Sequence, residues 1–309
     1  MTDTYGVQAP VTPSSAAHPQ TLARIARLEL RARTVVDGML SGMHRSPHRG
    51  SSVEFAQHRD YVPGDEIRHI DWKVYARSDR YHIKQFEEET NLRATVLLDV
   101  SESMNYRGAQ SALSKRDYAA VCSVALASLL IRQRDAVALA ICGDGVEQFV
   151  PHSSTPGHTR TISETIEKAK PSAKSNLGGS LHDLAERMQR RGLLLAFSDF
   201  FTQPEDVMRG LQHFRHRHHE VVLFHVLDRD EIEFPFKTAA TFLDMEVESA
   251  ITAEPNALRR EYLAAFGAFV EGLKRDCREL GMDYVLLRTD EPVDTTLARY
   301  LATRMNRAR

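Results

Sequence analysis

Short apolar runs alternate with amphipathic segments along the chain from residue 92 onward. The runs have the length and the continuous apolar character of strands that are buried on both faces. They lie at residues 92–99, 135–142, 193–198, 220–227 and 283–289. The segments between them carry apolar side chains at helical spacing, for example Leu177, Leu181, Leu184 and Met188. This alternation predicts an α/β domain with a doubly wound, mainly parallel sheet and helices on both faces.

The same kind of spacing predicts one leading helix before this domain. Between Thr21 and about Leu40 apolar side chains recur at helical intervals, and Gly42 follows as an end signal. Residues 1–19 are rich in Thr, Ser, Ala and Pro and lack any periodicity, which is typical of a disordered tail.

Residues 43–91 have a different character. They contain many charges, glycine and proline turn signals, and only short β-like pieces such as residues 81–86. We therefore divide the chain into a disordered tail (1–19), an N-terminal helix with a small irregular β-containing subdomain (20–91), and the α/β domain (92–309). Within that domain, residues 232–247 place Pro235 among alternating apolar residues, which indicates an edge hairpin or a β-excursion rather than a central strand.

Composition narrows the range of functions. The chain has 309 residues, of which 42% are hydrophobic and 27% charged, enough for one large core and a smaller appendage. A formal charge of -2 gives no basic excess for binding nucleic acid. Cys122, Cys142 and Cys277 lie far apart in apolar runs, which fits reduced thiols. No run approaches the ~20 apolar residues that cross a bilayer, and no secretory pattern is present, so we expect a cytoplasmic protein without a membrane anchor.

Oxygen-bearing side chains follow two of the predicted strands. Asp99, Ser101 and Ser103 stand at alternate positions where the first strand ends, and Asp199 ends the third. Ser175 precedes a glycine-rich helix start in the sequence SNLGGSL. Because ligands collect at the carboxyl ends of parallel strands, we expect these five side chains at one rim of the sheet. Hydroxyls with two carboxylates suit Mg2+, with Mn2+ or Ca2+ as alternatives, although each residue taken singly is also explained as an ordinary capping residue.

Taken together, the DxSxS of Asp99, Ser101 and Ser103, the later SNLGGSL and the strand-ending SDF resemble the metal-ion-dependent adhesion site of von Willebrand factor A domains. The upstream stretch YVPGDEIRHIDWKVYARSDR, followed by FEEETN and LLDVSESM, is similar to the signature of the domain-of-unknown-function number fifty-eight family. This resemblance covers about residues 48–200. It implies a von Willebrand A-like fold and a MoxR-type AAA+ ATPase as partner, because such proteins are typically encoded beside these ATPases.

Two positions depart from the von Willebrand pattern. The loop hydroxyl is commonly Thr, and Ser175 keeps the oxygen donor but lacks the methyl group that restricts a Thr rotamer. Asp199 is followed by Phe200 rather than by Gly, as is usual in the narrower family.

The charged residues of the upstream signature allow two interpretations. Asp65, Arg68, Asp71 and Arg77 can form a charged lattice that braces the subdomain around Trp72, or they can contact a partner protein. Bracing is the better supported of the two, because paired charges near a tryptophan more often stabilise a fold.

Two further charged runs have simple explanations. The histidines of HFRHRHH complement the carbonyl dipole at a helix end rather than form a metal cluster. They are His213, His216, His218 and His219. Glu87, Glu88 and Glu89 form a solvated charge run, for which a contact role stays open.

Signatures of common enzymes are missing from the sequence: it has no GxSxG elbow, GxxxxGK[ST] loop, GxGxxG or HExxH. The best enzyme alternative is a Mg-dependent phosphohydrolase of the haloacid dehalogenase type, with Asp99 as nucleophile and Asp199 as metal ligand, but its usual second Asp is Ser101 here. An adhesion module would need export. We therefore expect a non-catalytic, metal-dependent protein-binding module that assists a MoxR-type ATPase in assembling or maturing a complex that contains an unknown client protein.

Overall fold

The computed structural model describes the chain in two compact units. The described residues are 17–43, 58–60, 75, 81–84, 92–236, 240–243, 250–253 and 255–307. One unit groups Met1–Arg45 with Leu92–Arg309, and the other is Ser46–Asn91. The sequence division at residues 20–91 placed the leading helix with the irregular subdomain, whereas the structure places it with the sheet.

In the second unit the structure describes one antiparallel pair of short strands, β1 (His58–Asp60) and β2 (His82–Lys84). The β-like piece expected at residues 81–86 therefore contains a strand. The charged residues of the upstream signature lie outside the described residues, and so does the acidic run. They are Asp65, Arg68, Asp71, Arg77, Glu87, Glu88 and Glu89.

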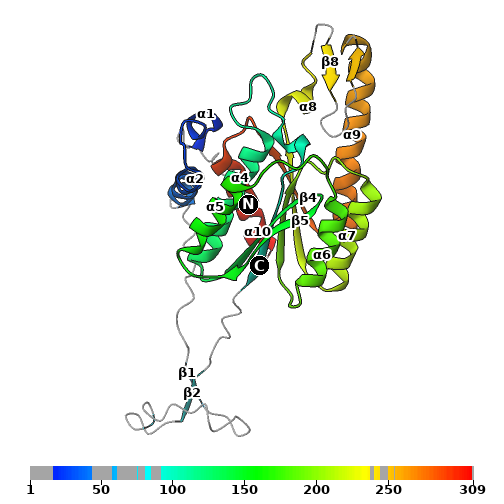
Figure 1. Cartoon of the computed structure of the whole chain (residues 1–309). Helices are drawn as coiled ribbons and strands as arrows, with labels where there is room; N and C mark the ends of the chain where they lie inside the picture. The colour runs from blue at the N-terminus through cyan, green and yellow to red at the C-terminus, as the bar shows by residue number, and fades with distance from the viewer. Residues whose placement is uncertain are drawn as a thin grey trace, which may run out of the picture. The chain divides into compact units, whose positions relative to one another are not determined.

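A six-stranded sheet forms the centre of the larger unit (Figure 1). Its strand order is β10-β7-β6-β3-β4-β5, and every neighbouring pair is parallel except β4 with β5. The strands are β3 (Arg93–Asp99), β4 (Ala136–Gly143), β5 (Gly145–Ser153), β6 (Leu193–Ser198), β7 (Glu220–Leu227) and β10 (Asp283–Arg288). All five predicted strands are present, and the predicted α/β fold class is confirmed.

The edge strand β5 was not predicted. Its side chains are partly buried or exposed, none is fully buried, and it contains Pro151, so it lacks the continuous apolar run that marks the central strands. Gly145, with φ of 122°, turns the chain directly from β4 into β5.

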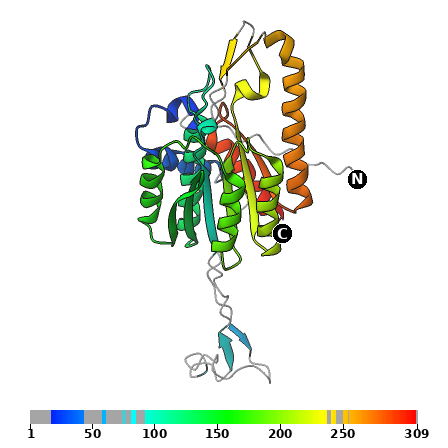
Figure 2. The same ribbon diagram turned by 45° about the vertical axis from the view of Figure 1, so that its right-hand side comes forward.

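Helices cover both faces of the sheet (Figure 2). Alternate residues of β3 divide between two apolar cores, since Val96 and Leu98 belong to one core and Leu97 to the other. The helices of the first core are α2 (Leu28–Met43), α4 (Lys115–Arg132), α5 (His158–Lys168) and α10 (Val293–Arg307). The helices of the second core are α6 (Leu177–Arg187), α7 (Pro204–His216) and α9 (Pro255–Glu279).

The leading helix is shorter than predicted. The chain forms a short helix α1 (Pro19–Leu22), then a turn, and then α2. The carboxylate of Glu167 on α5 accepts a 2.8 Å hydrogen bond from the Leu28 backbone N–H, which satisfies a free donor where α2 begins. The expected tail of residues 1–19 also includes structured positions, because Ala17 is fully buried and Pro19 starts α1.

The remaining elements complete the larger unit. Residues 232–247 were expected to form a hairpin or β-excursion, and the structure has the short helix α8 (Arg229–Glu233) followed by an antiparallel pair, β8 (Ala240–Leu243) and β9 (Ala250–Ala253). The three cysteines are buried and free. None of the helices within the described residues combines the length and the apolar content that a membrane crossing needs.

Candidate functional site

Asp99, the last residue of β3, forms the floor of the candidate site and is only 2% exposed. Its Oδ1 accepts a 2.8 Å hydrogen bond from the Ser101 backbone N–H. Its Oδ2 accepts a 2.6 Å hydrogen bond from the Ser198 hydroxyl, at the end of β6. Because β3 and β6 are adjacent parallel strands, their carboxyl ends bring these groups to the same rim of the sheet.

Ser101 and Ser103 lie in the turn that follows β3. Ser101 precedes a 3-10 turn, η3 (Glu102–Asn105), but its hydroxyl makes no capping hydrogen bond. The two serine hydroxyls instead hydrogen-bond each other at 3.2 Å. A capping role therefore does not explain why a serine stands at position 101. Asp99 does accept a hydrogen bond from the backbone N–H two residues further on, as an aspartate in a turn commonly does. Ser101 is buried, whereas Ser103 is partly exposed.

Asp199 follows β6 and is almost completely buried. Its Oδ1 accepts a 3.1 Å hydrogen bond from the Phe201 backbone N–H, and its Oδ2 accepts a 2.7 Å hydrogen bond from Nζ of Lys115. The structure thus brings Asp99, Ser101, Ser103 and Asp199 to one rim.

Ser175 lies on a neighbouring loop that is attached to the same rim. Ser172 in this loop forms an isolated parallel bridge with Ser101, and the Asn176 backbone N–H donates a 2.7 Å hydrogen bond to the carbonyl of Gly143, at the end of β4. Ser175 itself is partly exposed. Within the described residues, its hydroxyl forms no hydrogen bond with the other four predicted ligands.

The rim contains a buried cation that the sequence analysis missed. Lys115, the first residue of α4, is fully buried, and its Nζ lies 2.7 Å from Oδ2 of Asp199 and 2.6 Å from Oε1 of Glu231 on α8. The ammonium also lies 4.7 Å from the centroid of the Phe201 ring, which favours a cation. In the sequence Lys115 is one basic residue at a predicted helix start, and no motif relates it to Glu231.

Burial and neighbouring charges set the protonation of these groups. Burial, and then the charge of Asp199, raise the pKa of Asp99 to about 6. Burial also acts to raise the pKa of Asp199, but the charge and hydrogen bond of Lys115 outweigh burial and leave that pKa below its usual value. Burial opposes the charge of Lys115 as well, yet Asp199 and Glu231 hold its pKa above the ordinary lysine value.

Phe200 has a backbone conformation that glycine adopts more readily than other residues. Its φ is 55°, in the left-handed region, which costs a residue with a side chain about 1–2 kcal/mol. The ring is 2% exposed and packs edge-on against His225 at 5.7 Å between ring centroids. Burial of this ring offsets the backbone cost and holds Asp199 directly before a sharp change of direction.

The donor set at the rim fits a divalent cation. When Asp99, Asp199 and Glu231 are ionised and Lys115 is protonated, the rim has an excess of two negative charges. Within the described residues no group of three or more His, Cys, Asp or Glu side chains could hold a metal ion, so the ligands would have to include hydroxyls. Asp99, Ser101 and Ser103 would hold a hard cation such as Mg2+, with Asp199 and Ser175 beside it. Within the described residues, the histidine run at the end of α7 is not part of such a group. Helix α7 ends at His216, so the run lies at a helix end, as the sequence analysis predicts.

A mainly parallel six-stranded sheet, with carboxylates and hydroxyls where β3 and β6 end, is the arrangement that the resemblance to von Willebrand A domains predicts. The chain belongs to the family described as "Protein of unknown function DUF58", which it matches over residues 57–268. It is 29% identical to the uncharacterised protein Rv1480 of Mycobacterium tuberculosis over 291 residues, which cover 93% of this chain and 90% of that relative.

The solved structures that are similar to this chain at low identity include BatB and an Rpn10 domain. The conserved hypothetical protein BatB from Bacteroides thetaiotaomicron is 10% identical, with a TM-score of 0.41, over 70% of this chain and 99% of that chain. The VWA domain of SpRpn10 is also 10% identical, with a TM-score of 0.40, over 67% of this chain and 94% of that chain.

Proposed function

We propose that this protein is a non-enzymatic protein-interaction module whose rim site binds Mg2+, or alternatively Mn2+ or Ca2+, and presents it to an acidic side chain of a partner. The observation that carries the proposal is the layering of the rim. Asp99 and Asp199 are buried at its floor, whereas Ser103 and Ser175 are partly exposed. A cation held between these layers would face solvent on the side of the neutral hydroxyls.

The ion pair of Lys115 supports this function, because it leaves one carboxylate fewer to coordinate a cation. Because its ammonium neutralises Asp199, a bound cation would receive little anionic charge from the protein. A hard cation with few anionic ligands keeps water in its coordination sphere and can exchange it for a carboxylate from outside. Recognition of a Glu or Asp side chain on a partner follows from this chemistry.

The partner that we propose is a MoxR-type AAA+ ATPase in the cytoplasm, acting on a complex that contains a client protein. The support for this assignment is family membership together with the upstream signature. Asp65, Arg68, Asp71 and Arg77 of that signature are the proposed source of additional contact. Charges on such a surface would make the association sensitive to salt.

Titration calorimetry with Mn2+ and Mg2+ tests the metal site. Wild-type protein should bind one ion weakly, and Asp99→Ala should abolish binding while the circular dichroism spectrum is unchanged. Asp206→Ala is the matched control, because Asp206 is an exposed carboxylate on α7. Equal metal binding by wild-type protein and Asp99→Ala would refute the site.

Association with the ATPase requires a separate test. A pull-down with the co-encoded ATPase should lose the complex in EDTA and with Asp199→Ala. Retention of the ATPase in EDTA, and by the double variant of Asp99 and Asp199 to Ala, would show that the rim does not determine binding. Charge reversal at Arg68 should weaken the complex further only if that residue is in contact rather than buried as a brace.

One observation favours the phosphohydrolase alternative. The structure places a lysine, Lys115, against Asp199, and such chemistry needs a positioned lysine. Two other observations oppose it: Asp99 is 2% exposed, and both of its oxygens already accept hydrogen bonds. If wild-type protein hydrolyses p-nitrophenyl phosphate in Mg2+ and Asp99→Asn does not, the phosphohydrolase alternative is correct.

A further inference from the structure

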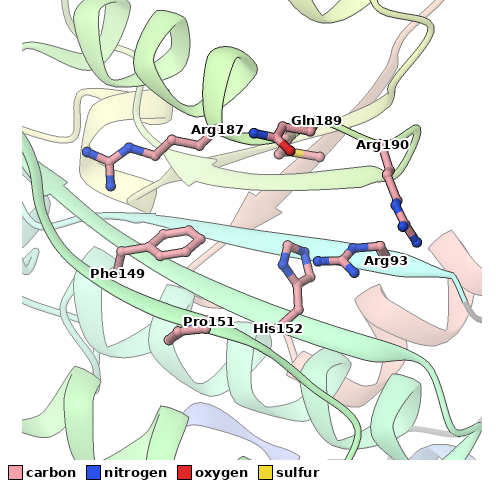
Figure 3. Close-up of a pocket in the computed structure, with 8 residues that line it drawn as sticks. Arg93, Phe149, Pro151, His152, Arg187, Gln189 and Arg190 are labelled. Carbon is pink, nitrogen blue, oxygen red and sulfur yellow. The ribbon is translucent and has the colours of Figure 1, made fainter.

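A second charged site lies at the opposite end of β3 from Asp99. Arg93 begins the strand that Asp99 ends, so the two sites are separated by roughly 20 Å along the strand. At the Arg93 end the surface forms a pocket of about 680 Å³, within the usual range for small-molecule sites. Figure 3 shows its lining, which comes from β3, from β5, and from the end of α6 with the turn that follows.

The pocket is basic and lacks an internal counter-charge. Arg93, Arg187 and Arg190 line it, and none of its lining residues is acidic. None of the three arginines forms an ion pair with another described residue. By contrast, Arg191, the next residue along the chain, lies outside the lining and pairs with Glu220 at 3.5 Å.

His152 adds a polar group to this pocket without adding charge. Its Nε2 lies 3.2 Å from the Thr95 hydroxyl. Burial, and then the charges of Arg93 and His158, lower the pKa of His152 to about 4, so the ring is neutral at pH 7. The neighbouring arginines therefore supply the positive charge, and the imidazole supplies a hydrogen-bonding edge.

The two ends of the pocket differ in chemistry. At one end Arg93 lies beside His152, and Arg190 extends toward the same place from the opposite side (Figure 3). At the other end the Arg187 guanidinium lies 5.8 Å from the centroid of the Phe149 ring. This division suits a ligand with an anionic head and a flatter, less polar body.

We infer that this pocket binds a small organic phosphate, with the phosphate between Arg93 and Arg190 and the organic part along Phe149. Guanidinium groups pair with phosphate oxygens through two parallel hydrogen bonds. The three arginines form no ion pair with the described residues, and their charges together would compensate a dianion. The same charges exclude a metal cation. The lining combines arginines with the aromatic ring of Phe149, which favours a ligand with an anionic head and an apolar body over an acidic peptide. This inference does not depend on the metal site at the other end of the strand.

Titration calorimetry with phenyl phosphate and inorganic phosphate tests the pocket. Both should bind saturably to the full chain, and phenyl phosphate should bind more tightly. Arg190→Gln should weaken phenyl phosphate binding at least about tenfold, since it removes a charged hydrogen-bond donor. Arg191→Gln is the matched control and should change the dissociation constant less than about twofold. Both residues are exposed, so neither substitution disturbs a buried core.

Three outcomes would overturn the inference. The first is no saturable binding of either phosphate. The second is an equal loss of affinity in Arg190→Gln and Arg191→Gln, because this would indicate diffuse attraction and not a pocket. The third is binding of a glutamate-rich peptide without binding of phenyl phosphate, which would assign the pocket to a protein partner. If inorganic phosphate binds as tightly as phenyl phosphate, the assigned role of Phe149 is wrong.

Discussion

At the carboxyl end of β3, Asp99 and Asp199 share a buried site with the ammonium of Lys115, whereas at the amino end of the same strand Arg93 and Arg190 line a pocket without an acidic residue. The difference follows from burial. Charges removed from water need partners within the protein, and at the rim Lys115 pairs with Asp199 and Glu231. The arginines of the pocket stay hydrated and can be left without partners. One end therefore depends on an internal cation, and the other is available for an external anion.

The largest expected effect tests the internal compensation directly. Lys115→Met would leave Asp199 and Glu231 without their shared cation, and we expect a loss of about 3–5 kcal/mol in the free energy of unfolding, measured with urea in EDTA. Arg209→Met is the control, because Arg209 forms an exposed ion pair with Asp206 and should cost less than about 1 kcal/mol. A loss below about 1 kcal/mol for Lys115→Met would mean that the two ends of β3 do not differ in this way.

A second test addresses the packing that positions the rim loop. A Cβ on Gly178 would lie 2.7 Å from Cβ of Asp206 and 2.9 Å from its backbone carbonyl carbon. Gly178→Ala should therefore destabilise the protein by about 1–3 kcal/mol and weaken Mn2+ binding, since the loop with Ser175 precedes this helix turn. Gly157→Ala is the control, because a Cβ there meets no atom within 4 Å. If both variants unfold at the same urea concentration, the contact between α6 and α7 does not constrain the loop.

Ligand stabilisation can show whether the two ends act independently. Mn2+ and phenyl phosphate, each at ten times its dissociation constant, should each add about 1.4 kcal/mol to the free energy of unfolding. The two increments should add to within ~0.5 kcal/mol, because the sites share no residues. Asp99→Ala should remove only the first increment, and Arg190→Gln only the second. Loss of both increments in either variant would mean that the sites are coupled.

The smallest expected effect is a pH dependence at the pocket. Folding lowers the pKa of His152 from 6.5 to about 4, so the folded state prefers the neutral ring. The contribution of the neutral ring to the free energy of unfolding is fully present above pH 6.5, and it is lost as the pH falls from 6.5 toward 4. Between pH 7 and pH 5, wild-type protein should lose about 1 kcal/mol relative to His152→Gln, after allowance for partial exposure of the ring. His182→Gln, at an exposed position on α6, is the control for removal of an imidazole. A constant difference between wild type and His152→Gln would contradict the prediction.

The sequence predicted the elements whose pattern is local. The central strands were predicted because a strand buried on both faces is a continuous apolar run, as β3 and β6 are. Strand β5 was missed because its exposed side chains interrupt that pattern. The start of α2 was misplaced, and the backbone N–H where this helix begins is satisfied by Glu167, which lies far along the chain.

The same reasoning applies to the sites. Asp99, Ser101 and Ser103 are close in sequence and form a motif, so their proximity was predicted. Lys115 and Glu231 come from segments more than a hundred residues apart, and a single lysine at a helix start carries no signal of an ion pair. Arg93 and Arg190 line one pocket only because β3 and the turn after α6 reach the same end of the sheet.

The position of α2 in the chain has a consequence for synthesis on the ribosome. This helix emerges before every strand of the sheet, yet its buried residues Val35, Val36 and Met39 belong to a core that α4 and α10 complete. Leu297 and Tyr300 of α10 are among the last residues of that core to be translated. Until they appear, the part of the apolar face of α2 that α10 covers has no partner, and such exposed surface promotes aggregation. The nascent chain should therefore depend on chaperones that bind apolar segments until α10 has left the ribosome.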